Sequence, residues 1–412
     1  MNHFEYRNGE LYAEEVPVTK LAEDYGTPLY VYSASTIRRH FKAFDSAFDG
    51  LEHLTCFSVK ANSNIGVLRL MAEMGGGMDI VSGGELFRAL KAGVPGSKIV
   101  YSGVGKKAHE IREALEADIL MFNVESMPEL ERINEIALDM GKVARVSFRL
   151  NPDVDPKTHP YISTGMKKNK FGLDIEHSRA AYALAQKLPG IDPVGIDCHI
   201  GSQLTTIEPF LEALEKILAF YRELREMGID IRYLDLGGGL GITYDQEEPP
   251  HPETFGKALA ESIKGLPLTL ILEPGRVIAG NMGILVAEAQ YLKSTPSKNF
   301  VIVDAAMNDL IRPALYQSFH GIGEVVQHGR AAQNYDVVGP ICESSDFLAR
   351  ERELPEIKQG ELLAVFSAGA YGFTMSSNYN SRPRAAELIV DGDRVKVARR
   401  RESYEDLVAL EL

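Results

Sequence analysis

Tryptophan is absent from this 412-residue chain, and its three cysteines are Cys56, Cys198 and Cys342. Cysteines so few and so far apart give neither a disulfide framework nor the paired spacing of a zinc site, so we expect reduced thiols and no metal. No apolar stretch reaches the ~18 residues of a spanning helix. The N-terminus, MNHFE, lacks the basic and apolar parts of a signal peptide. The sequence therefore predicts a cytoplasmic protein without a membrane segment.

Positive charge is also scarce. Lysine and arginine number 44 against 58 aspartates and glutamates, which gives a formal net charge of −14. No basic stripe offsets this excess of acid, so we expect no binding to nucleic acid or to an anionic membrane. The apolar share of 45% and the charged share of 25% are those of an ordinary globular protein. The length predicts about two or three domains.

What the chain does contain is a regular alternation of short apolar runs and helical stretches. The apolar runs cover residues 54–59, 78–81, 98–101, 118–122, 144–150, 195–200, 232–236 and 269–272. Helical patterns lie between them at 65–74, 85–92, 108–116, 128–140, 178–188, 207–227 and 252–264. Ser82 and Ser126 each precede a glutamate by three residues, as in a capping box. Eight strand–helix repeats predict parallel strands with right-handed crossovers and favour a (β/α)8 TIM barrel over an open sheet.

The alternation of apolar runs and helical stretches ends at the eighth run, because no comparable helix follows it. Strand-like runs appear instead at 284–291, 300–304, 334–338, 362–366, 387–390 and 394–397, separated by turn signals such as Asp391-Gly392-Asp393. We therefore predict an α/β barrel over residues 34–277 and a second, all-β domain, resembling a sandwich or a small barrel. Residues 1–33 contain two short strand-like pieces and are expected to join residues 278–412 in that domain, because the barrel needs no ninth strand.

Polar residues and glycines stand where the predicted barrel strands end, which is the reactive rim of this fold. Lys60 ends the first run, His199 lies in the sixth, and Glu273 follows the eighth. Other residues at these positions are Asp79 and Ser82 in and after the second run, Asn123 after the fourth, Arg149 in the fifth, and the glycines of 237–241 after the seventh. So many coincidences at one rim argue for a site.

Each of these residues also has an ordinary explanation. Lys60 could be a solvated lysine, His199 a satisfied core histidine, and Glu273 half of an ion pair with Arg276. The glycine run could be a plain tight turn, and it does not fit the dinucleotide-binding spacing. Taken together, however, they make up a pyridoxal phosphate site. A desolvated lysine supplies neutral amine for an imine, glycine backbone can wrap a phosphate, and a carboxylate can keep a pyridine nitrogen protonated.

Six motifs along nearly the whole chain resemble the diaminopimelate decarboxylase family, within the alanine-racemase-like class (fold type III) of pyridoxal phosphate enzymes. They are FSVKAN at 57–62, HIGSQ at 199–203, LDLGGGLG at 234–241, EPGR at 273–276, GPICESSD at 339–346 and GAYG at 369–372. Their order and spacing are highly specific to this group. The resemblance implies decarboxylation of meso-2,6-diaminopimelate to L-lysine and CO2, the last step of lysine biosynthesis, with pyridoxal 5'-phosphate as cofactor.

The resemblance also implies roles for single residues. Lys60 would hold the cofactor as an imine, His199 would stack on its ring, and Glu273 would pair with the ring nitrogen. The phosphate would be held by Ser202, Gly237, Gly238, Gly239 and the start of EPGR, with Gly275 and Arg276. Asp79 and Arg149 would support the cofactor from behind, and Tyr371 would reach both cofactor and substrate. Arg276, Arg312 and Tyr316 would hold a substrate carboxylate. Cys342 and Glu343 would come from the partner subunit of a homodimer with composite sites.

Substrate choice can be argued from charge. Diaminopimelate ends in a second carboxylate and ammonium, whereas ornithine and arginine end in a cation alone. Arg312 would supply the fixed cation and Glu343 the acid that the second head requires. Cys342 or Lys60 would protonate the carbanion left by CO2.

Three alternatives remain open on the residues alone. An ornithine or arginine decarboxylase would share the barrel motifs. A racemase would need two opposed acid–base groups and would leave the segment 339–346 unexplained. A non-catalytic regulatory relative would be expected to have lost cofactor contacts, yet Lys60, His199, Glu273 and Cys342 are all present.

Overall fold

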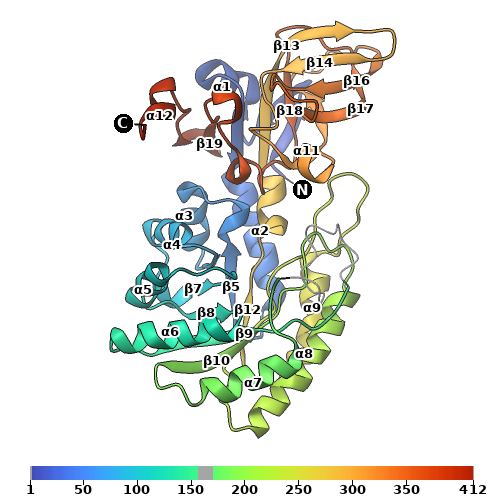
Figure 1. The fold of residues 1–412 in the computed structure, drawn as a ribbon. Helices are drawn as coiled ribbons and strands as arrows, with labels where there is room; N and C mark the ends of the chain where they lie inside the picture. The colour runs from blue at the N-terminus through green and yellow to red at the C-terminus, as the bar shows by residue number, and fades with distance from the viewer. Residues whose placement is uncertain (1, 156–169, 412) are drawn as a thin grey trace. The chain divides into compact units, whose positions relative to one another are not determined.

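The computed structural model of the chain describes residues 2–155 and 170–411 (Figure 1). The chain forms two compact units. The barrel unit is made of His40–Ile242 and Glu248–Val277, and the β unit of Met1–Arg39, Thr243–Glu247 and Ile278–Leu412. A short piece of a barrel loop, Thr243–Glu247, thus belongs to the β unit. Among the described residues, none of the helices combines the length and apolar character that a bilayer span requires.

Eight parallel strands close the barrel, which confirms the predicted fold. They are β5 (His53–Ser58), β6 (Gly77–Ile80), β7 (Ile99–Tyr101), β8 (Met121–Val124), β9 (Ala144–Arg149), β10 (Ile191–Asp197), β11 (Tyr233–Asp235) and β12 (Thr269–Leu272), and β12 pairs with β5. Strand β10 begins before the predicted run at 195–200. Its register with β9 shifts between Pro193 and Gly195, where proline has no N–H to give to the ladder.

Helices connect the barrel strands, and each predicted helix is found within a few residues. They are α2 (Ala34–Asp45), α3 (Ile65–Glu73), α4 (Gly83–Lys91), α5 (Ala108–Glu116), α6 (Met127–Asp139), α7 (Ile175–Ala185), α8 (Glu208–Glu226) and α9 (Pro252–Ile263). Ser82 and Ser126 cap α4 and α6 through their hydroxyls. The predicted reciprocal half of each capping box is wrong, because Glu85 and Glu129 accept from the amides of Val81 and Glu125, one residue before the cap.

The barrel interior has an apolar floor made of Cys56, Val100, Leu120, Met121, Val194 and Ile271. In a strand, residues two apart face the same side of the sheet. The residues two positions after Cys56, Val100, Met121 and Ile271 are Ser58, Ser102, Asn123 and Glu273, all buried and all polar. A polar layer therefore stands directly above the floor, toward the carboxyl ends of the strands.

The β unit is built around β4 (Leu29–Ser33), a fully buried strand of Leu29, Tyr30, Val31, Tyr32 and Ser33. It pairs with β13 (Gly283–Ser294) and β19 (Ala386–Asp391) in a sheet that also contains β14 (Asn299–Val303), β15 (Ile322–Glu324), β16 (Ala332–Val338), β17 (Phe347–Pro355), β18 (Leu362–Val365) and β20 (Arg394–Arg399). A separate small sheet holds β1 (Phe4–Arg7), β2 (Glu10–Ala13) and β3 (Val16–Pro17). Residues 1–33 contain four strands, β1–β4, rather than the two predicted strand-like pieces. Strands β15 and β17 were also not predicted, nor were the helices α1 (Val18–Tyr25), α10 (Arg276–Ala279), α11 (Arg312–Tyr316) and α12 (Tyr404–Val408).

Candidate active site

Lys60 stands at the carboxyl end of β5, in the 3-10 turn Val59–Ala61 that directly follows the strand. Its Nζ lies 3.0 Å from Oδ2 of Asp79, a fully buried carboxylate on β6. Ser58 Oγ donates to the same oxygen at 2.8 Å. The lysine side chain is 36% exposed, so it is not desolvated as the sequence argument assumed. Asp79 Oδ1 is buried without a hydrogen-bond partner among the described residues, so this carboxylate has acceptor capacity left at the rim.

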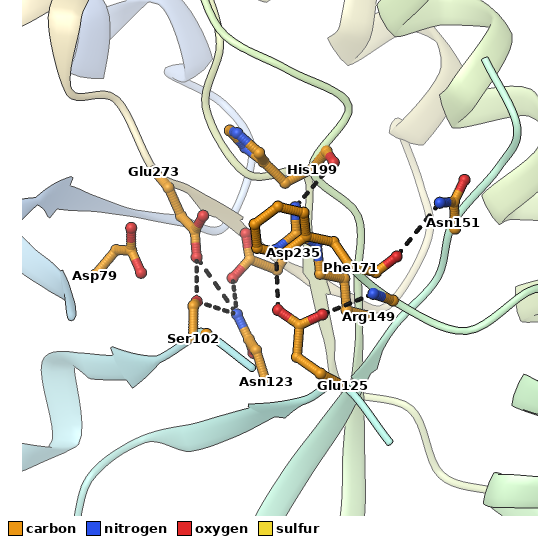
Figure 2. Close-up of polar contacts among 12 residues, drawn as sticks. Asp79, Ser102, Asn123, Glu125, Arg149, Asn151, Phe171, His199, Asp235 and Glu273 are labelled. Carbon is orange, nitrogen blue, oxygen red and sulfur yellow. Dashed lines mark hydrogen bonds and ion pairs between the residues drawn. The ribbon is translucent and has the colours of Figure 1, made fainter. Parts of the chain in front are cut away.

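Glu273 follows β12 and belongs to a cluster of three buried carboxyl groups with Asp235 and Asp197, whose nearest oxygens lie within 4.8 Å of one another. Asn123 Nδ2 donates to Glu273 Oε1 at 3.3 Å and to Asp235 Oδ2 at 3.2 Å, and Ser102 Oγ donates to Glu273 at 3.3 Å (Figure 2). Asn123 therefore links two of the three carboxyl groups. Burial, followed by the charge of Asp235, raises the pKa of Glu273 well above its usual range. Burial and the neighbouring acids therefore oppose ionisation of Glu273.

His199 lies just beyond β10 and is held as a neutral ring. The backbone N–H of Gly238 donates to its Nδ1 at 3.1 Å, which places the ring proton on Nε2. Burial, with the positive charges of Arg149 and Lys60, lowers the pKa of His199 well below its ordinary value. An uncharged imidazole at the strand ends presents a flat apolar face with a hydrogen-bond donor at its edge.

The loop after β11 consists of Gly237, Gly238 and Gly239, and its backbone leaves no room for larger residues. Gly237 and Gly239 have φ values of +63° and +122°, in the region that side chains disfavour. A Cβ on Gly238 would lie 2.1 Å from the carbonyl oxygen of Glu273. The N–H of Gly237 donates to Asp235 Oδ1 at 2.9 Å, so the site's own side chains brace the loop. This close packing fixes the loop beside Glu273 and leaves backbone, not side chains, at its surface.

Arg149 ends β9 and ties several loops together. Its Nη1 donates to Glu125 Oε1 at 3.0 Å, its Nη2 to the carbonyl of His199 at 3.2 Å, and its guanidinium lies 4.7 Å from the ring centroid of Phe171 (Figure 2). Burial opposes its charge, but Glu125 and Asp197 raise the pKa of Arg149 above its ordinary value. Arg149 therefore stays charged and orders the backbone that carries His199.

The other cofactor residues predicted in the barrel unit lie at the same ends of the strands. Gly275 precedes the short helix α10, and Arg276 begins it. Arg276 is 6% exposed, and its Nη2 donates to Ser202 Oγ at 3.1 Å. The structure therefore places the predicted barrel residues at the carboxyl ends of seven strands, on one rim.

The remaining predicted residues belong to the β unit. Arg312 and Tyr316 are the two ends of α11, with the guanidinium 5.9 Å from the tyrosine ring. Tyr371 has a φ of +56°, which is costly for a bulky residue and is often found where geometry serves function. Cys342 is exposed, and the neighbouring Glu343 accepts from Tyr379 at 2.8 Å and from Ser345 at 2.5 Å.

Four site residues were not identified from the sequence: Ser102, Glu125, Asp197 and Asp235. Asp197 and Asp235 interrupt apolar strands two residues before His199 and Gly237. A charged residue in a buried strand, spaced by two from a site residue, is the signal that could have found them. Asp197 Oδ1 is buried without a hydrogen-bond partner among the described residues, and burial and Asp235 raise the pKa of Asp197 well above its usual range.

Residues 34–280 match the family described as pyridoxal-dependent decarboxylase, pyridoxal binding domain. This range contains the whole barrel and every rim residue described above. The closed barrel, the polar residues at its rim and the family match together show that the chain is a pyridoxal-dependent decarboxylase.

Relatives that match the full length of the chain identify a single family within this class of enzymes. The chain is 56% identical over 413 residues to the diaminopimelate decarboxylase of Haemophilus influenzae, covering 100% of this chain and 99% of the relative, and 54% identical to that of Vibrio cholerae at the same coverage. The chain belongs to the diaminopimelate decarboxylase family. Among solved structures, the enzyme of Helicobacter pylori complexed with L-lysine is 44% identical with a TM-score of 0.93, covering 96% of this chain and 99% of that one. The diaminopimelate decarboxylase of m. jannaschi is 41% identical with a TM-score of 0.95, covering 100% of this chain and 98% of that one.

A lysine/ornithine decarboxylase from Vibrio vulnificus has a TM-score of 0.80 at 22% identity, covering 91% of this chain and 97% of that one. At this identity the likeness shows a common fold alone.

Proposed function

We propose that this protein removes CO2 from meso-2,6-diaminopimelate to give L-lysine, with pyridoxal 5'-phosphate as cofactor. The observation that carries the proposal is the rim in which Lys60, His199 and Glu273 stand together at strand ends beside a loop of three glycines. Family membership over the full chain supports the same reaction.

The rim fits a pyridoxal phosphate group. Its glycine loop leaves backbone at the surface because a Cβ on Gly238 would strike Glu273, and Arg276 and Ser202 add a cation and a hydroxyl for a phosphate. A neutral His199 suits the face of an aromatic ring, and Lys60 carries an amine at the mouth of the barrel. Bound there, the group would draw electrons from Cα of the substrate as the carboxylate leaves.

The chain's own residues would hold that group and place its protons. Lys60 would attach it through its amine, which Asp79 holds in position at 3.0 Å. Glu273 would pair with the ring nitrogen, and its raised pKa would make it a strong proton acceptor there. Asn123 and Ser102 donate to Glu273 and fix its plane. Arg149 orders the backbone of His199.

The β unit would supply substrate contacts. Arg312 and Tyr316 on α11 would bind the distal carboxylate of diaminopimelate. Glu343, whose pKa is lowered by hydrogen bonds from Ser345 and Tyr379, stays ionised and would bind the distal ammonium. Tyr371 would contact cofactor and substrate from its constrained backbone.

We further propose a homodimer in which Cys342 and Glu343 act in the partner's site. Cys342 is exposed on its own chain, as a residue that completes a neighbouring site must be. Its thiol would return a proton to the carbanion at Cα, with Lys60 as the other candidate donor. A cytoplasmic location agrees with the three free cysteines.

The proposed function is tested by CO2 release from diaminopimelate, lysine, ornithine and arginine, each offered to the cofactor-loaded protein. We expect release from meso-diaminopimelate alone, with L-lysine as the product. Faster release from ornithine or arginine would replace the proposed substrate, and conversion of diaminopimelate to a stereoisomer without CO2 would replace decarboxylation by racemisation. A protein that binds no cofactor would be a non-catalytic relative.

A further inference from the structure

The β unit holds Arg312 by a set of contacts that the family motifs do not mention. Arg312 is 5% exposed. Its Nε donates to Nε2 of His320 at 3.3 Å, and its Nη2 donates to Ser318 Oγ at 3.2 Å. The ring centroid of Tyr244 lies 5.0 Å from its guanidinium carbon. One edge of the guanidinium is therefore bonded to the protein, and an aromatic ring lies close to it.

The chemistry of its neighbours fixes the proton of His320. A guanidinium N–H can only donate and a backbone carbonyl can only accept. Because Arg312 Nε–H faces Nε2, and the carbonyl of Phe366 lies 2.9 Å from Nδ1, Nδ1 carries the proton and Nε2 accepts. His320 is fully buried, and Arg352 Nη1 also donates to its carbonyl at 2.8 Å. His320 is therefore a neutral acceptor that cannot swing away from Arg312.

Tyr244 reaches this cluster from the segment Thr243–Glu247, the part of a barrel loop that belongs to the β unit. Glu247 Oε2 accepts from the amides of Tyr244 and Asp245 at 2.9 and 2.8 Å, so the segment is folded on itself. The Tyr244 ring meets that of His320 edge to face, with centroids 5.3 Å apart at 73°. Tyr244 and His320 thus brace each other as well as Arg312.

We propose that His320 and Tyr244 are positioning residues that orient Arg312 toward the distal carboxylate of the substrate and so set selectivity for a two-headed amino acid. This inference rests on the proposed function, in which Arg312 binds that carboxylate. The hydrogen bonds from Nε to His320 and from Nη2 to Ser318 fix the plane in which the guanidinium would meet a carboxylate. Because the Arg312 guanidinium is already held in place, it loses less conformational entropy when the carboxylate binds.

The test compares two ligands of the cofactor-loaded enzyme. L-lysine, the expected product, retains the distal carboxylate and ammonium, whereas cadaverine has the same chain without the carboxylate. Inhibition constants of both against diaminopimelate are measured for wild type, Tyr244→Leu, Tyr244→Phe and His320→Ala, with His328→Ala as the control. His328 is another histidine of the β unit, and its Nε2 lies 3.3 Å from Glu361. Calorimetric binding of lysine gives a readout independent of turnover, and thermal unfolding checks each fold.

Tyr244→Leu and His320→Ala should each weaken the binding of lysine by about tenfold, which is the typical effect of losing a hydrogen bond or ring contact to a charged group. Cadaverine should bind as it does to wild type. KM for diaminopimelate should rise by a similar factor with kcat nearly unchanged. Tyr244→Phe, which keeps the ring, and the His328→Ala control should behave like wild type. If His320→Ala does not fold, the half-buried Tyr244 still carries the test.

Arg312→Met separates this inference from the proposed function. If it abolishes the preference for lysine over cadaverine while Tyr244→Leu and His320→Ala keep that preference, the positioning role is overturned and the substrate contact stands. If Arg312→Met itself keeps the preference, the substrate contact fails and the positioning role fails with it. Parallel losses for both ligands in Tyr244→Leu would also overturn the proposal, because they would mean general damage to the site.

Discussion

Asp309, just before α11, should make the free energy of unfolding of the β unit depend on pH. It is 1% exposed, and its Oδ2 accepts from the backbone N–H of Ala306 at 3.0 Å. Burial raises the pKa of Asp309 to about 7, although the Ala306 hydrogen bond opposes the shift. A group whose folded pKa lies above its unfolded value binds its proton more tightly in the folded protein. Its stabilising effect is complete at low pH and is lost as pH rises through about 7.

Asp309→Asn removes this ionisation and keeps an oxygen for Ala306. From about pH 5 to about pH 8, wild type releases the proton from a group that the unfolded chain has already ionised at ~3.9. The free energy of unfolding changes by about 1.4 kcal/mol for each pH unit between pH 5 and the folded pKa, an interval of about two units. We therefore expect the free energy of unfolding of wild type to fall by roughly 3 kcal/mol relative to that of the variant. The assay is urea unfolding at both pH values with equal cofactor loading, followed by tyrosine fluorescence because the chain has no tryptophan.

Asp336→Asn is the matched control in the same unit. Burial opposes the charge of Asp336, but a hydrogen bond from Lys298 at 2.7 Å lowers its pKa below the usual value. Its stabilising effect is present above the unfolded pKa and is lost only as pH falls below about 4. Asp336→Asn should therefore be destabilised by the same amount at both pH values. If Asp309→Asn also differed from wild type by a constant amount, the assignment of a raised pKa to Asp309 would be refuted.

Three further predictions concern the site. Glu273→Gln should fold and bind cofactor but turn over slower by several orders of magnitude, through loss of the electron sink; a near-normal rate would refute the role of Glu273 at the ring nitrogen. Gly238→Ala should lose cofactor and about 1–3 kcal/mol of stability, because its Cβ would lie 2.1 Å from a backbone oxygen, whereas Gly84→Ala, with 3.8 Å to the nearest atom, should be tolerated in both assays. Mixing Lys60→Ala and Cys342→Ala subunits should restore roughly a quarter of wild-type activity, because about half of the dimers are mixed and each has one intact site. Activity no higher than the parents' average would place both residues in one chain.

The barrel could be predicted because its strands, buried on both sides, appear as short continuous apolar runs, and its amphipathic helices show the helical period between them. Strand β17 was missed for the opposite reason. Its sequence, FLARERELP, has exposed charged residues at its centre, and its pairing with β16 contains register shifts. Strand β15 has three residues, one of them glycine, too few to show a period. Strands of this kind are specified by their neighbours in the sheet rather than by their own pattern.

The site was predictable where a residue stands alone at a strand end, as Lys60 and Glu273 do. Asp197 and Asp235 were missed because they lie inside apolar runs that predict strands, and their importance comes from closeness to Glu273 in the folded barrel. Tyr244 could not be found, because it lies far from Arg312 in the sequence and only the fold brings the two together. His320 lies close to Arg312 in the sequence, but outside α11, and no regular spacing links the two residues. The exposure of Lys60 also depends on tertiary packing, since a strand-end lysine can be buried or open with the same local sequence.

The central claim is that Lys60 holds the cofactor through which CO2 is released. The most direct measurement is CO2 release from meso-diaminopimelate by purified Lys60→Ala, together with the absorbance of bound cofactor near about 420 nm. Lys98→Ala is the control, because Lys98 also lies in the barrel unit but donates to the carbonyl of Gly75 at 2.7 Å. The account predicts that Lys60→Ala folds normally and loses both signals while Lys98→Ala keeps them. Substantial CO2 release by Lys60→Ala would contradict it.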